Sequence, residues 1–325
     1  MKFFLTVFLS LPMAAFSAGD TPSYRLTDGR AVAPLEMFQE CDQCPEMIVL
    51  PLGSFMMGGK LGESRNPYDM FRENATLRRR APDEVNIIPA EMPRHKVEID
   101  IPFAMGRNEV TNAEWMACVA AKACAHIPDH WVPRPEGRQM LGPNHPAVNL
   151  SYLDMLEYVA WLNNLVGAEG GAEVYRLPTE AEWEYSARAG TQTRFAQGEE
   201  LTTQQANFSR RGTEQLRGVE RPDLATRVLP VPVDTLDAAN GWGLRHMSGN
   251  VREMTQSCWT TEHLGLRTSS AYLMLTQSQA ECLRTSKGGS FTGAMDYSRL
   301  AGRGRARETF RTVNFGFRVV RQFRN

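Results

Sequence analysis

Three segments of this chain carry apolar residues at helical spacing, and each begins in the same way. A hydroxyl residue stands three positions before a carboxylate, as in Thr111 and Glu114, Ser151 and Asp154, and Thr179 and Glu182. The hydroxyl can accept a hydrogen bond from the first turn of a helix while the carboxylate reaches back to the chain entering it. The pattern predicts helices over residues 115–121 and 183–188, and a longer helix that follows Ser151 and Asp154.

The middle helix is expected to pack on a core, because its apolar residues recur on one face. They are Tyr152, Met155, Val159, Leu162 and Val166. We interpret this stripe as packing surface and not as a cofactor site.

Shorter β-prone runs surround these helices. Residues 47–51 and 54–57 are expected to form a strand pair around Gly53, and residues 95–101 alternate as in a half-buried strand. Residues 315–320 are expected to form a closing strand. After Gly190 no long periodic segment is apparent, so loops and short strands are expected there.

The N-terminus has the pattern of a secretory signal. Residues 1–18 have Lys2 at their start, an apolar centre and a small-residue exit. The alternative is a buried N-terminal helix, for which the charged start is unfavourable. We expect an N-terminal arm over 19–45 and a single domain over 46–323, with a long polar insertion at 58–90.

Composition narrows the class of protein. The chain has 325 residues with 42% hydrophobic and 22% charged residues, and a formal net charge of −1. This near-neutral balance gives no indication of a nucleic-acid partner. No second long apolar run follows the signal, so no transmembrane segment is expected in the mature chain. The many glycines and prolines favour an α+β domain rich in loops.

The six cysteines fall into three neighbouring pairs along the chain. Their spacing suggests disulfides between Cys41 and Cys44, Cys118 and Cys124, and Cys258 and Cys282. A redox pair at Cys41 or thiolate metal ligands are the alternatives. No βαβ pattern follows Cys44 and no histidine has zinc-ligand spacing, which disfavours both alternatives.

Two stretches are candidates for chemistry. The turn from Gly249 to Glu253 places Asn250 and Glu253 beside glycines, and these oxygens suit a hard cation such as calcium. The alternative is that both side chains only satisfy loop backbone. The stretch 287–318 brings together Lys-Gly-Gly-Ser-Phe, five arginines and Asn-Phe-Gly-Phe-Arg, and we expect it to form the floor of a pocket. The chain contains no P-loop, dinucleotide fingerprint or serine-hydrolase motif.

Several motifs in fixed order resemble the formylglycine-generating enzyme family, also called sulfatase-modifying factors. They are Met-Ile-Val-Leu-Pro from residue 47, Glu-Val-Thr-Asn from 109, His-Pro-Ala-Val-Asn from 145, Arg-Leu-Pro-Thr-Glu-Ala-Glu-Trp-Glu-Tyr from 176, Gly-Asn-Val-Arg-Glu from 249, Gly-Gly-Ser-Phe from 288 and Gly-Phe-Arg from 316. The resemblance spans about residues 46–321. It implies one α+β domain with an irregular C-type-lectin-like topology and little regular structure, usually calcium-bound.

The resemblance also implies residues for two structural calcium sites. One would use Asn250, the carbonyl of Val251, and Glu253. The other would use Asn207 and Phe208, with Asp223 as a loosely aligned acidic ligand.

The catalytic part of the resemblance is incomplete. Family members hold Cu(I) between two cysteines, at the third and eighth positions beyond the serine that corresponds to Ser290. Gly293 and Ser298 occupy those positions here. Soft thiolates select Cu(I), whereas glycine offers no ligand and a serine hydroxyl is a hard one. Copper is therefore not expected.

Apart from the copper ligands, the resemblance implies residues that line the pocket. The implied pocket residues are Ser290, Tyr297, Arg303 and Asn314. Arg252 and Met254 replace two tryptophans common in the family, so a different ligand is expected.

These observations lead to three hypotheses. The first is a periplasmic or secreted binding or regulatory protein without the oxidation chemistry, resembling type VI secretion regulators of the TagR kind. Its partner would be an envelope protein or a small polar ligand. The second is a periplasmic tailoring enzyme of the PvdO kind that uses the same pocket for other chemistry. The third, an authentic copper-dependent oxidase, is disfavoured by the missing thiols.

Overall fold

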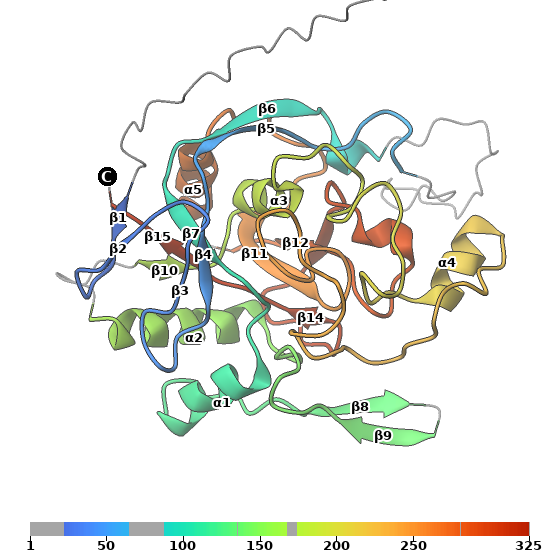
Figure 1. The fold of residues 1–325 in the computed structure, drawn as a ribbon, viewed down its shortest axis with the longest axis horizontal. Coiled ribbons are helices and arrows are strands. Elements are labelled where there is room, and N and C mark those ends of the chain that lie inside the picture. The colour runs from blue at the N-terminus through green and yellow to red at the C-terminus, as the bar shows by residue number, and fades with distance from the viewer. Residues whose placement is uncertain (1–22, 65–87, 135, 168–173, 280, 325) are drawn as a thin grey trace, which may run out of the picture.

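The structure is a computed structural model that describes residues 23–64, 88–134, 136–167, 174–279 and 281–324. The proposed signal at 1–18 and most of the proposed insertion lie outside the described residues. The predicted α+β class is confirmed, because helices and several small sheets alternate along the chain (Figure 1). The helices are α1 (Asn112–Ala120), α2 (Tyr152–Leu165), α3 (Glu180–Arg188), α4 (Arg210–Arg217) and α5 (Ser269–Gln277), with the short 3-10 turns η1 (Pro89–Glu91) and η3 (Met295–Ser298).

Two sheets hold most of the strands. One has five strands in the order β10-β15-β7-β4-β3, and the other has four in the order β13-β12-β11-β14. Three two-stranded pairs, β1-β2, β5-β6 and β8-β9, complete the fold. The strands are β1 (Tyr24–Arg25), β2 (Ala31–Val32), β3 (Met37–Phe38), β4 (Met47–Val49), β5 (Gly53–Met57), β6 (His95–Ile99), β7 (Phe103–Gly106), β8 (Trp131–Arg134), β9 (Gly137–Met140), β10 (Tyr175–Arg176), β11 (Arg252–Cys258), β12 (Arg284–Lys287), β13 (Gly304–Ala306), β14 (Phe315–Gly316) and β15 (Val320–Gln322).

The three predicted helices are present and their capping signals form as expected. In each, the hydroxyl accepts from the backbone N–H of the carboxylate residue, and that carboxylate accepts from the backbone N–H of the hydroxyl residue. Of the apolar stripe, Tyr152, Met155, Val159 and Leu162 are buried in one core cluster with Trp115 and Phe317, whereas Val166, just beyond the end of α2, packs partly buried against it. A second cluster surrounds Trp183 of α3, which packs against β11 and β12 (Figure 1).

Three expectations about the strands and helices need correction. Residues 47–51 and 54–57 do form strands, but β4 pairs with β3 and β7 while β5 pairs with β6. Pro51, which has no N–H to donate, lies where the chain passes from one sheet to the other. The expected closing strand is divided into β14 and β15, which belong to different sheets.

The region after Gly190 also contains two helices that the sequence pattern did not reveal. α4 starts at Ser209, whose hydroxyl accepts from Gly212 N–H, and ends at the left-handed Gly218. α5 starts at Thr268 in the same way. Both have eight or nine residues, which is short for a periodicity argument, and α4 is almost entirely polar.

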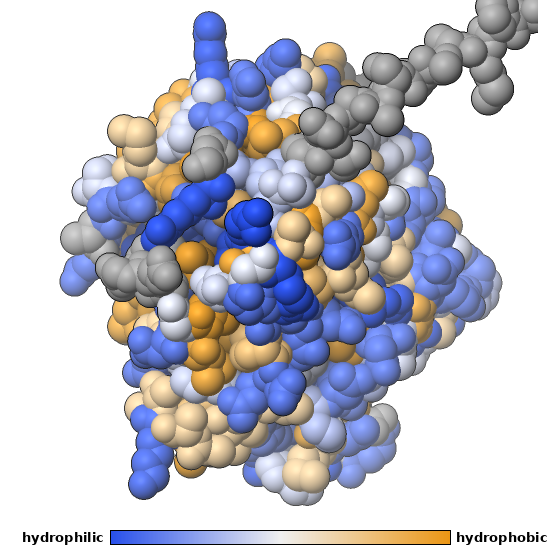
Figure 2. Space-filling view, turned by 60° about the vertical axis from the view of Figure 1, so that its left-hand side comes forward, coloured by the Kyte–Doolittle hydropathy of each residue, from blue (hydrophilic) through white to orange (hydrophobic). Residues whose placement is uncertain are grey.

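All three predicted disulfides are confirmed, between Cys41 and Cys44, Cys118 and Cys124, and Cys258 and Cys282. On the face shown in Figure 2, hydrophilic residues cover most of the surface, and hydrophobic residues lie between them in small groups. Among the described residues, no helix has the length and apolar character that crossing a membrane requires.

Candidate functional site

The four-stranded sheet separates two different environments, because side chains alternate between its faces. Glu253 of β11 lies opposite Lys287 of β12, and Met254 lies opposite Ser286. Ser286 in turn lies opposite Gly304 of β13. Neighbouring positions on one strand therefore serve different purposes: Glu253 faces the packed interior under α3, and Arg252 faces a cavity.

The face toward α3 contains fully buried charges with complete partner sets. Arg318 donates to the two carboxylate oxygens of Glu253 at 2.6 Å each, and the indole N–H of Trp183 donates to one of them at 2.7 Å. Arg318 also donates to backbone carbonyls of Gly106 and Arg245. The Gly-Phe-Arg motif at residues 316–318 thus supplies a structural ion pair, in which all five N–H groups of Arg318 donate hydrogen bonds.

A second buried pair lies beside it. Lys287 Nζ is 2.9 Å from Glu184 Oε2, and Arg188 donates to Glu184 Oε1 at 2.8 and 3.0 Å. Burial by itself would raise the pKa of Glu184, but the charges of Lys287 and Arg188 hold it well below its usual range. Glu184 is therefore ionised and anchors both cations.

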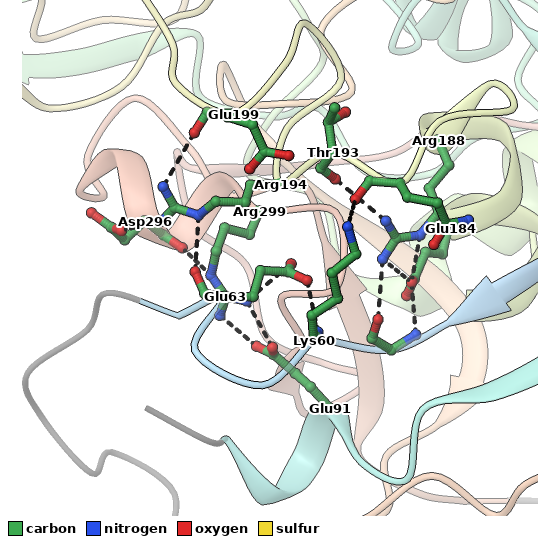
Figure 3. A network of polar contacts seen from close by, with 12 residues as sticks. Lys60, Glu63, Glu91, Glu184, Arg188, Thr193, Arg194, Glu199, Asp296 and Arg299 are labelled. Carbon is green, nitrogen blue, oxygen red and sulfur yellow. Dashed lines mark hydrogen bonds and ion pairs between the residues drawn. The ribbon is translucent and has the colours of Figure 1, made fainter. Parts of the chain in front are cut away.

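The network extends toward the two ends of the stretch between residues 64 and 88 (Figure 3). Arg299 donates to both oxygens of Glu91 at 2.7 and 2.8 Å and lies 3.5 Å from Glu63. Arg194 connects the Glu63 carbonyl with Asp296 of η3. Residues 58–64 are thereby connected to η1 and η3, and Gly58 is also hydrogen-bonded to Glu184 and Arg188 of α3 (Figure 3).

The opposite face of the sheet forms the floor of a cavity of about 260 Å³. Its lining comes mainly from the C-terminal stretch, as expected from the sequence. The lining residues are Ile88, Glu91, Arg252, Ser286, Asp296, Tyr297, Arg299, Gly302, Arg303, Gly304, Arg305 and Phe315.

The four pocket residues implied by the resemblance have different positions. Tyr297 and Arg303 line the cavity. Arg303 is buried, donates to both oxygens of Glu180 and lies over the Trp259 ring. Its role is therefore to join α3 to the cavity wall.

Ser290 and Asn314 are not among the residues that line the cavity. They lie on either side of Thr292, whose hydroxyl is 3.0 Å from Ser290 Oγ and accepts from Asn314 Nδ2 at 3.1 Å. The three side chains form a small polar group of their own.

The positions expected for copper ligands do not supply a soft donor. A Cβ added to Gly293 would contact the Tyr297 ring at 3.4 Å. Ser298 Oγ is buried without a hydrogen-bond partner and lies against Gly289, whose φ of +71° and lack of a side chain allow this approach. No described cysteine is free, since all six form disulfides. The residues present do not fit a Cu(I) centre.

The residues expected at the first proposed calcium site are engaged within the protein. Asn250 Oδ1 accepts from Val231 N–H at 2.8 Å and from Asn207 Nδ2 at 3.2 Å, while Asn250 Nδ2 donates to Glu109 Oε1. Val251 is buried, and Glu253 is held by Arg318. As the side chains lie, Glu253 fits calcium poorly because a guanidinium occupies its oxygens.

Sequence reasoning did not identify Glu109 as part of this cluster. Its Oε2 is buried without a partner, and burial together with the charge of Glu253 raises the pKa of Glu109 to about 8. The Oδ1 atom of Asn207 is also buried without a partner. Only the fold brings these residues together, since 98 positions or more separate Glu109 from the other two.

The second proposed calcium site is less complete. Asn207 and Phe208 are fully buried, whereas the Asp223 carboxylate is 58% exposed and is paired with Arg221 at 2.7 Å. Hydrogen bonding to Arg221 lowers the pKa of Asp223. The described residues contain no cluster of three His, Cys, Asp or Glu side chains placed for a metal ion.

Comparison with known proteins identifies the family of this chain. The profile of the sulfatase-modifying factor enzyme 1-like domain matches residues 33–323. The formylglycine-generating enzyme of Mycobacterium tuberculosis is 26% identical over 85% of this chain and 97% of its own length. That of Streptomyces coelicolor is 30% identical over 63% of this chain and 66% of its own.

A solved structure, that of PvdO from Pseudomonas aeruginosa, is similar with a TM-score of 0.66 and 29% identity, covering 90% of this chain and 100% of that one. Both the family profile and the fold therefore lead to one assignment. The chain belongs to the formylglycine-generating enzyme, or sulfatase-modifying factor, family.

Proposed function

We propose that this protein keeps the family's pocket but not its copper-dependent oxidation, and acts as a binding or regulatory protein of the periplasm or extracellular space. The observation that carries this proposal is that Gly293 and Ser298 stand at the two positions where the family resemblance implies copper-binding cysteines. The remaining cysteines cannot substitute for them while they form disulfides. An exported location is supported by the three disulfides, which persist in oxidising compartments, and by the signal-like residues 1–18.

Copper titration tests the central part of this proposal. Purified protein, native and after reduction, is titrated with Cu(I) against a chromophoric chelator. We expect no tight site in either form. Tight binding by the native protein would contradict the proposal.

A matched variant shows whether the frame around the missing site is intact. In Gly293→Cys/Ser298→Cys, a side chain at Gly293 meets only ordinary contacts at 3.4 Å or more. Tight Cu(I) binding by this variant, with none by the native chain, would attribute the lost site to the two thiols.

A tailoring enzyme of the PvdO kind is the second candidate, and the overlap with the PvdO structure over the whole of that chain favours it. The two candidates differ in what the cavity does to its ligand. Chemical change of a bound small molecule, abolished by filling the cavity, would support the enzyme. Binding without turnover would support the first proposal.

Calcium stays a structural proposal, with Asn207, Asn250 and the carbonyls of Phe208 and Val251 as the proposed ligands. Asn207 Oδ1 has no hydrogen-bond partner, whereas Asn250 Oδ1 would exchange its bonds from Val231 N–H and Asn207 Nδ2 for the metal ion. A ligand that binds only the folded state raises the unfolding temperature by mass action. Adding a calcium chelator should therefore lower the melting temperature, and readdition of calcium should restore it. An unchanged melting curve would contradict calcium binding.

A further inference from the structure

Most charges around the cavity are neutralised by partners in the protein. Arg299 is paired with Glu91, and Arg303 is paired with Glu180 at 2.8 and 3.1 Å. Asp296, another charged residue of the lining, is ion-paired with Arg194 and Arg217, which lie outside the lining. None of these groups has a free charge to offer a ligand.

Arg252 is different. Among the described residues, no oxygen accepts a hydrogen bond from its guanidinium and no carboxylate lies within ion-pair distance. Burial lowers the pKa of Arg252. A partly buried cation without a partner is costly to the fold. A bound anion would offset this cost, so Arg252 is a candidate for ligand binding.

A second orphan group lies beside it. Ser286 Oγ is buried and has no hydrogen-bond partner. A Cβ added to Gly304 would lie 2.0 Å from Arg252 Nη1 and 2.8 Å from Ser286 Oγ. The guanidinium and the hydroxyl therefore converge on the same glycine, where the lack of a side chain leaves room for both.

The surrounding walls suit an organic group. Phe315 lies opposite Arg252 in the parallel pair of β11 and β14, and Tyr297 and Ile88 also line the cavity. Arg305 extends over the Trp259 ring at 5.6 Å and adds a second positive charge at the exposed edge. Apolar walls with a few convergent polar groups are typical of small-molecule and peptide side-chain sites.

We propose that this cavity binds an organic carboxylate, which pairs with Arg252 and Ser286 while its apolar part packs against Phe315 and Tyr297. The planar guanidinium matches a carboxylate through two parallel hydrogen bonds. The ligand is either a free small acid or the carboxylate of a peptide. This inference rests on the proposed binding function and names the class of ligand that the pocket accepts.

The probes are 3-phenylpropionate, its neutral amide, and the blocked dipeptide acetyl-Gly-Phe with a free C-terminal carboxylate. Binding to the full mature chain is measured by calorimetry at low salt. We expect at least one carboxylate to bind and the neutral amide to bind about tenfold more weakly or not at all, because a charge-assisted pair is lost. Tighter binding of 3-phenylpropionate would indicate a free small acid as the ligand, and tighter binding of acetyl-Gly-Phe would indicate the carboxylate of a peptide.

Two variants locate the site. Arg252→Met removes the charge, and Gly304→Ala leaves it but places a methyl group against the guanidinium. Both should weaken carboxylate binding by about tenfold or more, with melting curves showing that they are folded. Arg221→Met, which removes an arginine paired with Asp223 outside the cavity lining, is the control and should bind as the native chain does.

Three results would overturn the inference: no carboxylate binding at millimolar concentration, equal binding of acid and amide, or unchanged binding by Arg252→Met. Tighter binding of phenyl phosphate than of 3-phenylpropionate would also contradict the carboxylate class. These failures would leave the copper result unaffected, so the loss of oxidation chemistry and the identity of the ligand are tested separately.

Discussion

Two neighbouring charged residues of β11, Glu253 and Arg252, lie on opposite faces of the four-stranded sheet and differ in whether they have a partner. Toward α3, Glu253 and Lys287 are fully buried, and each has an oppositely charged partner within 3 Å. Toward the cavity, Arg252 comes one residue earlier on the same strand and has none among the described residues. We infer from this difference that burial of a charged side chain does not by itself indicate a functional site. A paired charge indicates structure, whereas an unpaired one beside a cavity indicates a ligand site.

The largest expected effect comes from breaking the paired face. Glu184→Gln would leave Lys287 buried without its counter-charge and should lower the free energy of unfolding by about 3–5 kcal/mol. Chemical denaturation measures this change. The control is Arg107→Met, which breaks an exposed pair with Glu46 and should cost about 1 kcal/mol or less. Equal losses for the two variants would contradict the structural role of the paired face.

The disulfide at the end of β11 should contribute somewhat less. Cys258 and Cys282 are 24 residues apart, and replacing both by alanine should cost about 3 kcal/mol through the freedom regained by the unfolded chain. Replacing Cys41 and Cys44, which are three residues apart, is the matched control and should cost less. A larger loss from the short loop would mean that packing and not loop closure determines the effect.

Glu109 should make stability depend on pH. The pKa of Glu109 is about 8 in the folded protein and has the ordinary value of 4.5 in the unfolded chain. Between pH 4.5 and 8 the carboxyl is therefore protonated in the folded state and ionised in the unfolded state. The free energy of unfolding should therefore fall by about 1.4 kcal/mol per pH unit as pH rises through this window.

Glu109→Gln should remove this dependence of the free energy of unfolding on pH. Denaturation curves recorded at several pH values in the presence of a chelator measure the dependence in each protein. His246 acts in the opposite sense below pH 6.5, because burial lowers its pKa to about 3 and stability is lost as pH falls. The effect of His246 is present in both the native chain and Glu109→Gln, so it cancels when the pH profile of one is subtracted from that of the other. Parallel pH profiles for the two proteins would show that Glu109 is ionised in the fold.

The local features of the fold were predictable from the sequence. Capping pairs such as Thr179 and Glu182 identified three helices, because the signal lies within four residues. Cysteine spacing identified all three disulfides for the same reason. The pairing of β4 and β5 was not predictable, since strands adjacent along the chain need not be adjacent in a sheet.

The candidate site shows the same limit. The motifs predicted a pocket in the C-terminal stretch, where Tyr297 and Arg303 line the cavity but Ser290 and Asn314 do not. They also identified Arg252 as an unusual substitution. They could not show that Glu253 faces Arg318 while Arg252 faces the cavity, nor that Ser286 and Gly304 lie beside it. Those facts depend on strand register between segments that are distant in sequence.

The most direct measurement is the free energy of unfolding of Arg252→Met, set beside that of Glu184→Gln. If Arg252 has no partner in the protein, its removal should change stability by about 1 kcal/mol or less, or increase it, because an uncompensated charge is replaced by an apolar side chain. A loss as large as that of Glu184→Gln would show that Arg252 supports the fold, and would contradict a ligand site at this position.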